Sequence, residues 1–80
     1  MDKSSLLVEV QNIMREVLDE PEIVLTEKSV AGDIEGWDSL GHIQLVVAIE
    51  KRFKIKFNAR EILIWKNVGE ILDAIALKIG

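Results

Sequence analysis

The spacing of aliphatic residues constrains the fold of this chain more than any other feature of its sequence. Between Ser4 and Leu18 apolar side chains recur every three or four positions, which is the period of one face of an amphipathic helix. The same spacing returns in "DSLGHIQLVVAIEKRF", residues 38–53, and over residues 67–79. Two Phe, two Trp and no Tyr leave the core to Leu, Ile and Val, a composition that suits packed helices. These patterns predict an all-α fold.

A long connection separates the first two predicted helices. Pro21 should end the first helix by the residue before it. Asp38 should begin the second as its N-cap, because its carboxylate can accept a hydrogen bond from the first-turn backbone N–H of Leu40 or Gly41. We expect the connection to be an ordered crossover loop with one short helical turn. Five apolar residues would pin it to the core: Ile23, Leu25, Val30, Ile34 and Trp37.

Two later helix starts share the capping-box spacing, in which an N-cap residue is followed three positions later by an acid. Asn58 and Glu61 open a short helix that ends near Ile64, and Asn67 and Glu70 open a longer last helix. "FKIKF" alternates like a strand, but a lone strand is unstable, so we expect an extended link with its apolar residues inward. The predicted fold is a small four-helix bundle of three longer helices and one short helix.

Composition removes several classes of function for residues 1–80, which we expect to form a single domain. Without Cys there is neither a disulfide framework nor a thiolate metal site, and with one His a zinc site is not expected. No apolar run reaches the ~18 residues of a membrane span, and no N-terminal stretch has the pattern of a signal peptide. We therefore expect a cytoplasmic protein.

Charge is distributed unevenly along the chain. Residues 1–50 have three Lys and Arg against eleven Asp and Glu, a net of −8, whereas residues 51–80 have seven against three, a net of +4. Such asymmetry can mark a surface for a partner. The bases lack interleaved aromatic residues and the overall pI is near 4.9, so we expect no binding of nucleic acid.

The segment "GWDSLGH", residues 36–42, contains the chain's only His together with a Ser and an acid. Asp38, Ser39 and His42 are the residue types of a nucleophilic triad. However, Asp38 is needed as a helix cap, no Gly-rich turn offers an oxyanion hole, and so small a domain leaves little room for a substrate pocket. We expect no enzymatic activity. Turnover by the purified protein alone would be the sign of a minimal hydrolase.

Two other interpretations of Ser39 stay open at the level of single residues. Ser39 can be an ordinary first-turn residue that follows a cap, since Asp–Ser pairs before helices are common. Alternatively, a phosphate ester on its hydroxyl would lie near free N–H groups and the positive end of the helix dipole, which favours an anion by about 0.3–1 kcal/mol at an exposed site.

"WDSL" followed by "HIQLVVAIEKRFKIKF" resembles the phosphopantetheine attachment region of acyl carrier proteins, in which a D-S-L motif opens the second helix of a four-helix bundle. The resemblance covers nearly the whole chain, including the capped last helix at "NVGEILDAIALKI". It implies that Ser39 receives 4'-phosphopantetheine from coenzyme A through a separate phosphopantetheinyl transferase, which Asp38 helps to bind. The thiol of this arm would carry acyl groups as thioesters. Leu40, Val46 and Val47 would contact the enzymes that load and use the acyl group.

The end of the second predicted helix departs from the carriers of bacterial fatty acid synthesis, whose second helix is rich in acids. Here Glu50 is followed closely by Lys51, Arg52, Lys54 and Lys56. These bases can be a solvated helix end that complements the helix dipole. In the functional interpretation Lys51 and Arg52 contact partners, and complementary charge selects enzymes of a specialised pathway.

Gly41 and His42 are a second departure from the general carriers. Glycine costs about 1 kcal/mol of helix propensity against alanine, which indicates close approach of the arm or a partner unless the residue has simply drifted. We expect His42 to be a surface residue. Trp37 should anchor the end of the loop, and Trp65 should belong to the core or a lid.

Two alternatives to an acyl carrier remain. One is an amino-acyl or peptidyl carrier, whose motif usually has two glycines before the acid or the histidine, so that Trp37 argues against it. The other is an unmodified helical interaction module, which would dock through an exposed apolar face of the second helix. For a member of the carrier family we expect a monomer.

Overall fold

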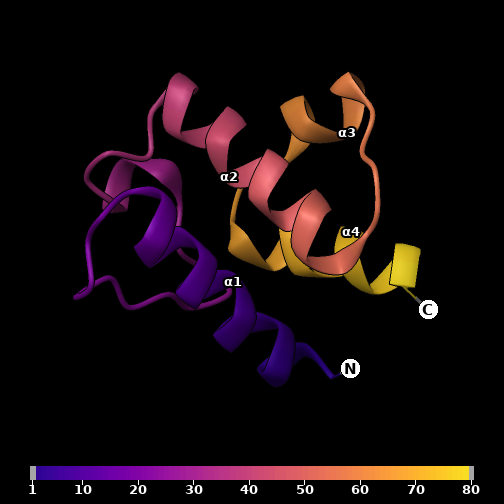
Figure 1. The fold of residues 1–80 in the computed structure, drawn as a ribbon, viewed down its shortest axis with the longest axis horizontal. Helices are drawn as coiled ribbons and strands as arrows, with labels where there is room; N and C mark the ends of the chain where they lie inside the picture. Colours follow the sequence, from indigo (N-terminus) through magenta and orange to yellow (C-terminus); the bar gives the residue numbers. More distant parts are fainter. Residues whose placement is uncertain (1, 80) are drawn as a thin grey trace.

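The computed structural model describes residues 2–79 and contains four α-helices within that range (Figure 1). They are α1 (Lys3–Val17), α2 (Ser39–Phe53), α3 (Ala59–Ile64) and α4 (Val68–Ile79), with a 3-10 turn, η1 (Ala31–Asp33), in the connection between α1 and α2. No strand occurs in the described range. The predicted all-α bundle of three longer helices and one short helix is confirmed.

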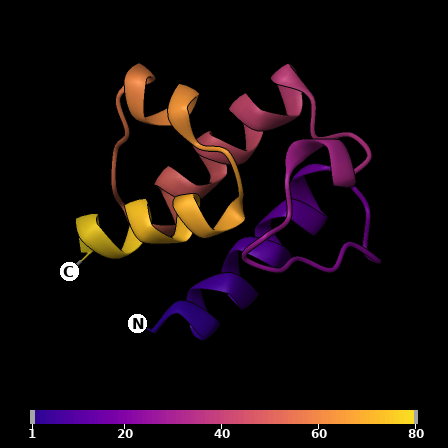
Figure 2. The ribbon, with the colours of Figure 1, turned by 180° about the vertical axis from the view of Figure 1, so that it is seen from behind.

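The core lies where α1 packs against both α2 and α4. In both views α3 lies on the side of the bundle opposite α1 (Figures 1 and 2), and it contributes no fully buried residue. Burial of each large aliphatic side chain stabilises the fold by about 1.5–3 kcal/mol. The core side chains are aliphatic apart from Met14 and Trp37: Leu6, Val10, Ile13, Met14, Leu25, Trp37, Leu45, Ile49, Val68, Ile71, Leu72 and Ile75.

The long loop between α1 and α2 is anchored by apolar side chains, as its sequence predicts. Leu25 and Trp37 are buried in the core, and Ile23 and Ile34 are half-buried against it. Val30 is an exception, because its side chain is 37% exposed, and its predicted anchoring role is wrong. The expected helical turn is present as η1, which begins directly after Val30.

The same loop also supplies hydrogen-bond acceptors to the start of α4, because the first backbone N–H groups of a helix have no intrahelical partner. The Val68 N–H donates to the Ser29 carbonyl at 2.9 Å, and the Gly69 N–H donates to the Glu27 carbonyl at 2.8 Å. A Cβ on Gly69 would lie only 3.0 Å from that Glu27 oxygen, so a larger residue here would push the loop away by a few tenths of an ångström. Figure 2 shows the loop passing beside the start of α4.

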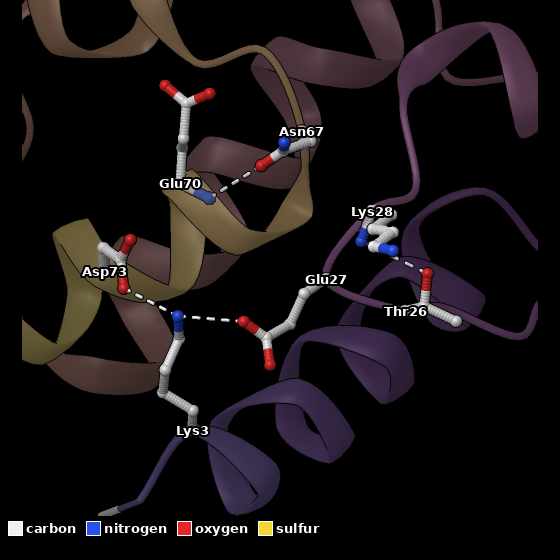
Figure 3. Close-up of polar contacts among 7 residues, drawn as sticks. All are labelled: Lys3, Thr26, Glu27, Lys28, Asn67, Glu70 and Asp73. Atoms are coloured by element: carbon white, nitrogen blue, oxygen red, sulfur yellow. Dashed lines mark hydrogen bonds and ion pairs between the residues drawn. The ribbon is translucent and has the colours of Figure 1, made fainter.

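A surface ion cluster connects the loop with both terminal helices (Figure 3). The Lys3 ammonium on α1 lies 2.9 Å from the Glu27 carboxylate of the loop and 2.9 Å from the Asp73 carboxylate of α4. The two carboxylates, Glu27 first, raise the pKa of Lys3. The groups are exposed, so the cluster contributes little to stability, but it marks where the three segments meet.

The two predicted capping boxes differ. At α3 the box is complete, because the Asn58 side chain accepts from the Glu61 N–H at 2.9 Å and the Glu61 carboxylate accepts from the Asn58 N–H at 3.0 Å. At α4 the Asn67 side chain accepts from the Glu70 N–H at 3.0 Å, whereas the Glu70 carboxylate accepts from the Lys66 N–H. The backbone N–H of Asn58 lowers the pKa of Glu61.

Candidate functional site

Asp38 fixes the start of α2. Its backbone is extended, and its carboxylate accepts from the Gly41 N–H at 2.8 Å while its carbonyl accepts from the His42 N–H at 2.8 Å. The predicted cap is therefore present. Ser39 and Leu40 follow in the first turn, where the backbone N–H groups have no hydrogen-bond acceptor within the helix. The Ser39 side chain is exposed, so its hydroxyl is presented to solvent at the positive end of the helix dipole.

Gly41 is explained by packing inside the protein. It is buried, and a Cβ built on it would overlap the Gly36 carbonyl oxygen and lie 3.1 Å from Leu18 Cδ2. Gly36 itself has φ of 88°, a conformation that favours glycine. The expectation of drift at an exposed site is therefore wrong, and contacts within the protein account for the glycine without the arm or a partner. The first turn of α2 packs directly on the backbone of the loop that precedes it.

His42 is half-buried, so the prediction of a surface residue is wrong. Its Nδ1 accepts from Trp37 Nε1 at 3.0 Å, and its Nε2 lies 3.3 Å from the Ile62 carbonyl oxygen of α3. Both contacts are satisfied together by a neutral ring with the proton on Nε2. The imidazole stacks on Trp37 and meets Trp65 edge-on, each with ring centroids 6.0 Å apart. His42 therefore connects the end of the loop, α2 and α3.

A pocket of about 410 Å³ lies beside Ser39, between the start of α2 and the segment from α3 to α4. Trp37, buried as predicted, and Trp65, half-buried, both contribute to its wall. The exposed hydroxyl, the first-turn N–H groups and a nearby lysine together fit a phosphate ester with a flexible substituent. The residues that line this pocket include Ser39, His42, Ile62, Leu63, Lys66 and Asn67.

The apolar partner contacts predicted on α2 divide by helical position. Leu40 is 67% exposed and Val47 is 43% exposed, and with Ile43 they form a stripe at i, i+3 and i+7 along one face. Val46 is only 3% exposed, so its predicted role as a partner contact is wrong. Successive residues of a helix point about 100° apart, and Val46 faces the bundle when Val47 faces solvent. The same register shows Ile43 as a surface residue that the sequence had placed in the helix without a role.

The two predicted basic contacts at the end of α2 also differ from one another. Lys51 is exposed and forms no ion pair within residues 2–79. Arg52 is held by Glu9 of α1, with Nη2 2.8 Å and Nε 3.1 Å from Glu9 Oε2. Arg52 therefore joins α2 to α1 through an ion pair at the surface, whereas Lys51 has no such partner within residues 2–79.

Fold and site together define a helical domain that presents a serine at a helix start for attachment of a phosphate-linked group. The family described as "Phosphopantetheine attachment site" matches residues 8–75. The acyl carrier protein of Thermosynechococcus vestitus is 34% identical over 81 residues, covering 100% of this chain and 99% of that protein. The chain belongs to the acyl carrier protein family, and its cofactor is covalently attached phosphopantetheine.

A solved structure supports the same assignment at the level of the fold. The solution NMR structure of the holo acyl carrier protein from Geobacter metallireducens has a TM-score of 0.85 and 42% sequence identity, covering 91% of this chain and 84% of that chain. Members of the family act as carriers. Within residues 2–79, none of the helices has the length and apolar character needed to cross a membrane.

Proposed function

We propose that Ser39 carries the 4'-phosphopantetheine arm, and that residues 1–80 act as one acyl carrier domain without catalytic activity of its own. The observation that carries this proposal is the exposed Ser39 side chain in the first turn of α2, beside a pocket of about 410 Å³, in a member of a phosphopantetheine-binding family. When bound, the arm supplies a thiol that holds an acyl group as a thioester, which the chain cannot supply because it has no Cys.

The residues around Ser39 act on the phosphate end of the arm. Asp38 holds the helix start in place, so the first-turn N–H groups of Ser39 and Leu40 are directed toward an anion on the Ser39 oxygen. Lys66, which lines the same pocket, adds a positive charge. We expect these groups to orient the phosphodiester while the rest of the arm reaches partner enzymes.

The partners we propose are a phosphopantetheinyl transferase and the enzymes that load and use the acyl group, all acting in the cytoplasm on a monomeric carrier. Leu40 and Val47 lie on the exposed stripe that would contact them, and Asp38 would also help the transferase to bind. The cargo would belong to fatty acid, lipid or specialised metabolite biosynthesis. The bases at the end of α2 favour a specialised pathway, because complementary charge selects partners.

Intact mass spectrometry tests the attachment. The purified protein is incubated with coenzyme A, Mg²⁺ and a broad-range phosphopantetheinyl transferase. We expect a mass gain of one phosphopantetheinyl group in the wild type and in Ser4→Ala, a matched change at an exposed serine of α1, and no gain in Ser39→Ala. No gain in the wild type, or an equal gain in Ser39→Ala, would contradict the proposal.

The alternatives give different results in related experiments. An unmodified interaction module would show no mass gain with any transferase. An amino-acyl or peptidyl carrier would gain the arm but would then be loaded by an enzyme that activates amino acids, and not by one that activates fatty acids. We favour the acyl carrier because the relatives that match the chain along its length are acyl carrier proteins.

A further inference from the structure

The end of α2 opposite Ser39 presents three lysines on one surface. Lys51, Lys54 and Lys56 are exposed, and together with Glu50 and Ile55 they line a shallow groove of about 430 Å³. None of the three forms an ion pair within the part of the chain that the structure describes. We call these three residues the lysine surface.

The nearest acid in the groove does not neutralise the lysine surface through an ion pair. The Glu50 carboxylate accepts the backbone N–H of Phe57 at 2.8 Å and so fixes the link between α2 and α3. Three other bases have acidic partners close by: Arg52 with Glu9, Lys78 with Glu61, and Lys3 with Glu27 and Asp73. Lys28, Arg60 and Lys66 also form no ion pair within residues 2–79, but they are scattered over the first loop, α3 and the link to α4, whereas the three lysines lie within six residues and line one groove. The lysine surface therefore stands out as clustered positive charge that is left available.

The backbone at Lys54 supplies an independent observation. Lys54 ends α2 in the left-handed conformation, with φ of 57° and ψ of 46°. Glycine or asparagine is the usual residue there, since a larger L side chain is strained in this conformation. The other non-glycine residue with positive φ in the described range is Asp19, a type that tolerates it better. A lysine at this position sacrifices stability, which is understandable if its charge is used.

We propose that the lysine surface docks an acidic patch on a protein that handles the acyl group carried at Ser39. This inference rests on the proposed function. At 1.5 Å per residue, Lys54 lies about 22 Å along α2 from Ser39. An enzyme that receives the arm would therefore bear its acidic patch about 20 Å from the opening of its active site.

Charge favours a local acidic protein patch over an extended polyanion. The chain has a net charge of −4, with −8 in residues 1–50, so a membrane of anionic lipids or a nucleic acid would repel most of the molecule. The groove also lacks a large exposed apolar side chain for insertion into lipid, because Ile55 is half-buried against the core. An oriented encounter with a complementary acidic patch avoids both costs.

NMR titration of the full chain with end-capped hexaglutamate tests the surface. We expect amide shifts centred on residues 51–56 in about 20 mM salt and their loss in about 500 mM salt, where screening is strong. Lys51→Gln with Lys56→Gln should weaken binding about fivefold or more, and Lys28→Gln with Arg60→Gln, which removes the same charge at two other exposed positions, less than twofold. Equal weakening by the two pairs, or shifts centred elsewhere, would overturn the proposal.

Lys54→Gly separates binding from folding. It should raise the melting temperature by about 4–8 °C by removing the backbone strain, and weaken peptide binding about two- to fivefold. Unchanged peptide binding would overturn the proposal. Binding of the wild type to vesicles of equal parts phosphatidylglycerol and phosphatidylcholine, abolished by the Lys51 and Lys56 changes, would replace the protein partner with a membrane and also overturn it.

The transferase assay on the same variants keeps the two proposals apart. The variants of the lysine surface and the control pair should all gain the phosphopantetheinyl mass, because none of the changed residues lines the pocket beside Ser39. Peptide binding without any mass gain would contradict the proposed function, and mass gain without peptide binding would contradict the docking surface alone.

Discussion

The two ends of α2 differ in how firmly they are packed. At the N-terminal end Asp38 caps the helix, Gly41 packs on the preceding loop and His42 connects to α3, so that an exposed serine stands on a fixed support. At the C-terminal end Lys54 is in a strained conformation and the lysines around it are exposed. The difference indicates that the N-terminal end holds Ser39 in a fixed position, whereas the C-terminal end retains positive charge at a cost in folding stability.

The largest effect is expected at Gly41. In Gly41→Ala the new methyl group meets the Gly36 carbonyl and Leu18, and the overpacking should cost about 2–3 kcal/mol in the free energy of unfolding, measured with urea. Gly32→Ala is the matched control, because a Cβ at that position would meet no other residue within 4 Å beyond its chain neighbours, and it should change stability by less than about 0.5 kcal/mol. Equal effects would show that the N-terminal end of α2 is not packed as described.

Removal of His42 tests the connection between the loop and α3. His42→Ala leaves Trp37 Nε1 without its acceptor and the Ile62 carbonyl without its donor, which should cost about 1–2 kcal/mol by thermal unfolding. The indole N–H resonance of Trp37 should also shift by NMR. An unmoved indole resonance together with unchanged stability would return His42 to the surface role expected from sequence.

Asp38 should show a smaller effect that depends on the hydrogen bond. Asp38→Ala removes the acceptor for the Gly41 N–H and should cost about 1 kcal/mol, whereas Asp38→Asn retains the cap and should cost only a few tenths of that. Urea unfolding of the two variants side by side measures the difference. Equal losses would mean that the carboxylate charge, and not the cap, is what matters.

The smallest effects are expected among the bases, and they distinguish Arg52 from Lys51. Arg52→Gln breaks the contact with Glu9 and should cost about 0.5 kcal/mol, while Lys51→Gln should leave thermal stability within about 0.3 kcal/mol. A double-mutant cycle with Glu9→Gln checks that the Arg52 effect comes from this pair. Equal stability losses for the two bases would contradict their different surroundings.

What could be predicted from sequence was local. The caps at Asp38 and Asn58 involve residues three apart, and their hydrogen bonds are present as expected. The roles of Gly41 and His42 were misread because they depend on contacts that form only in the folded protein. Gly41 packs on the carbonyl of Gly36, and His42 contacts the carbonyl of Ile62. One general signal was available: the N–H of a buried tryptophan usually finds a hydrogen-bond acceptor, and the nearby His42 can serve as one.

The other feature that the sequence did not predict was which face of α2 is buried. Val46 and Val47 are chemically alike and adjacent, and only the packing of α2 on α1 decides that the first is buried and the second exposed. The helical pattern of α2 was too broadly apolar to give that orientation, since apolar residues occur on more than one face. Ile43 was missed as part of the exposed stripe for the same reason.

The central claim is that the phosphate-linked arm is attached to Ser39 and to no other residue. Fragmentation mass spectrometry of peptides from the transferase-treated protein tests it directly. We predict that the phosphopantetheinyl group is found on the peptide that contains Ser39, with the ester assigned to its side chain. Modification at any other serine or threonine, or complete reaction with no modified peptide around Ser39, would contradict it.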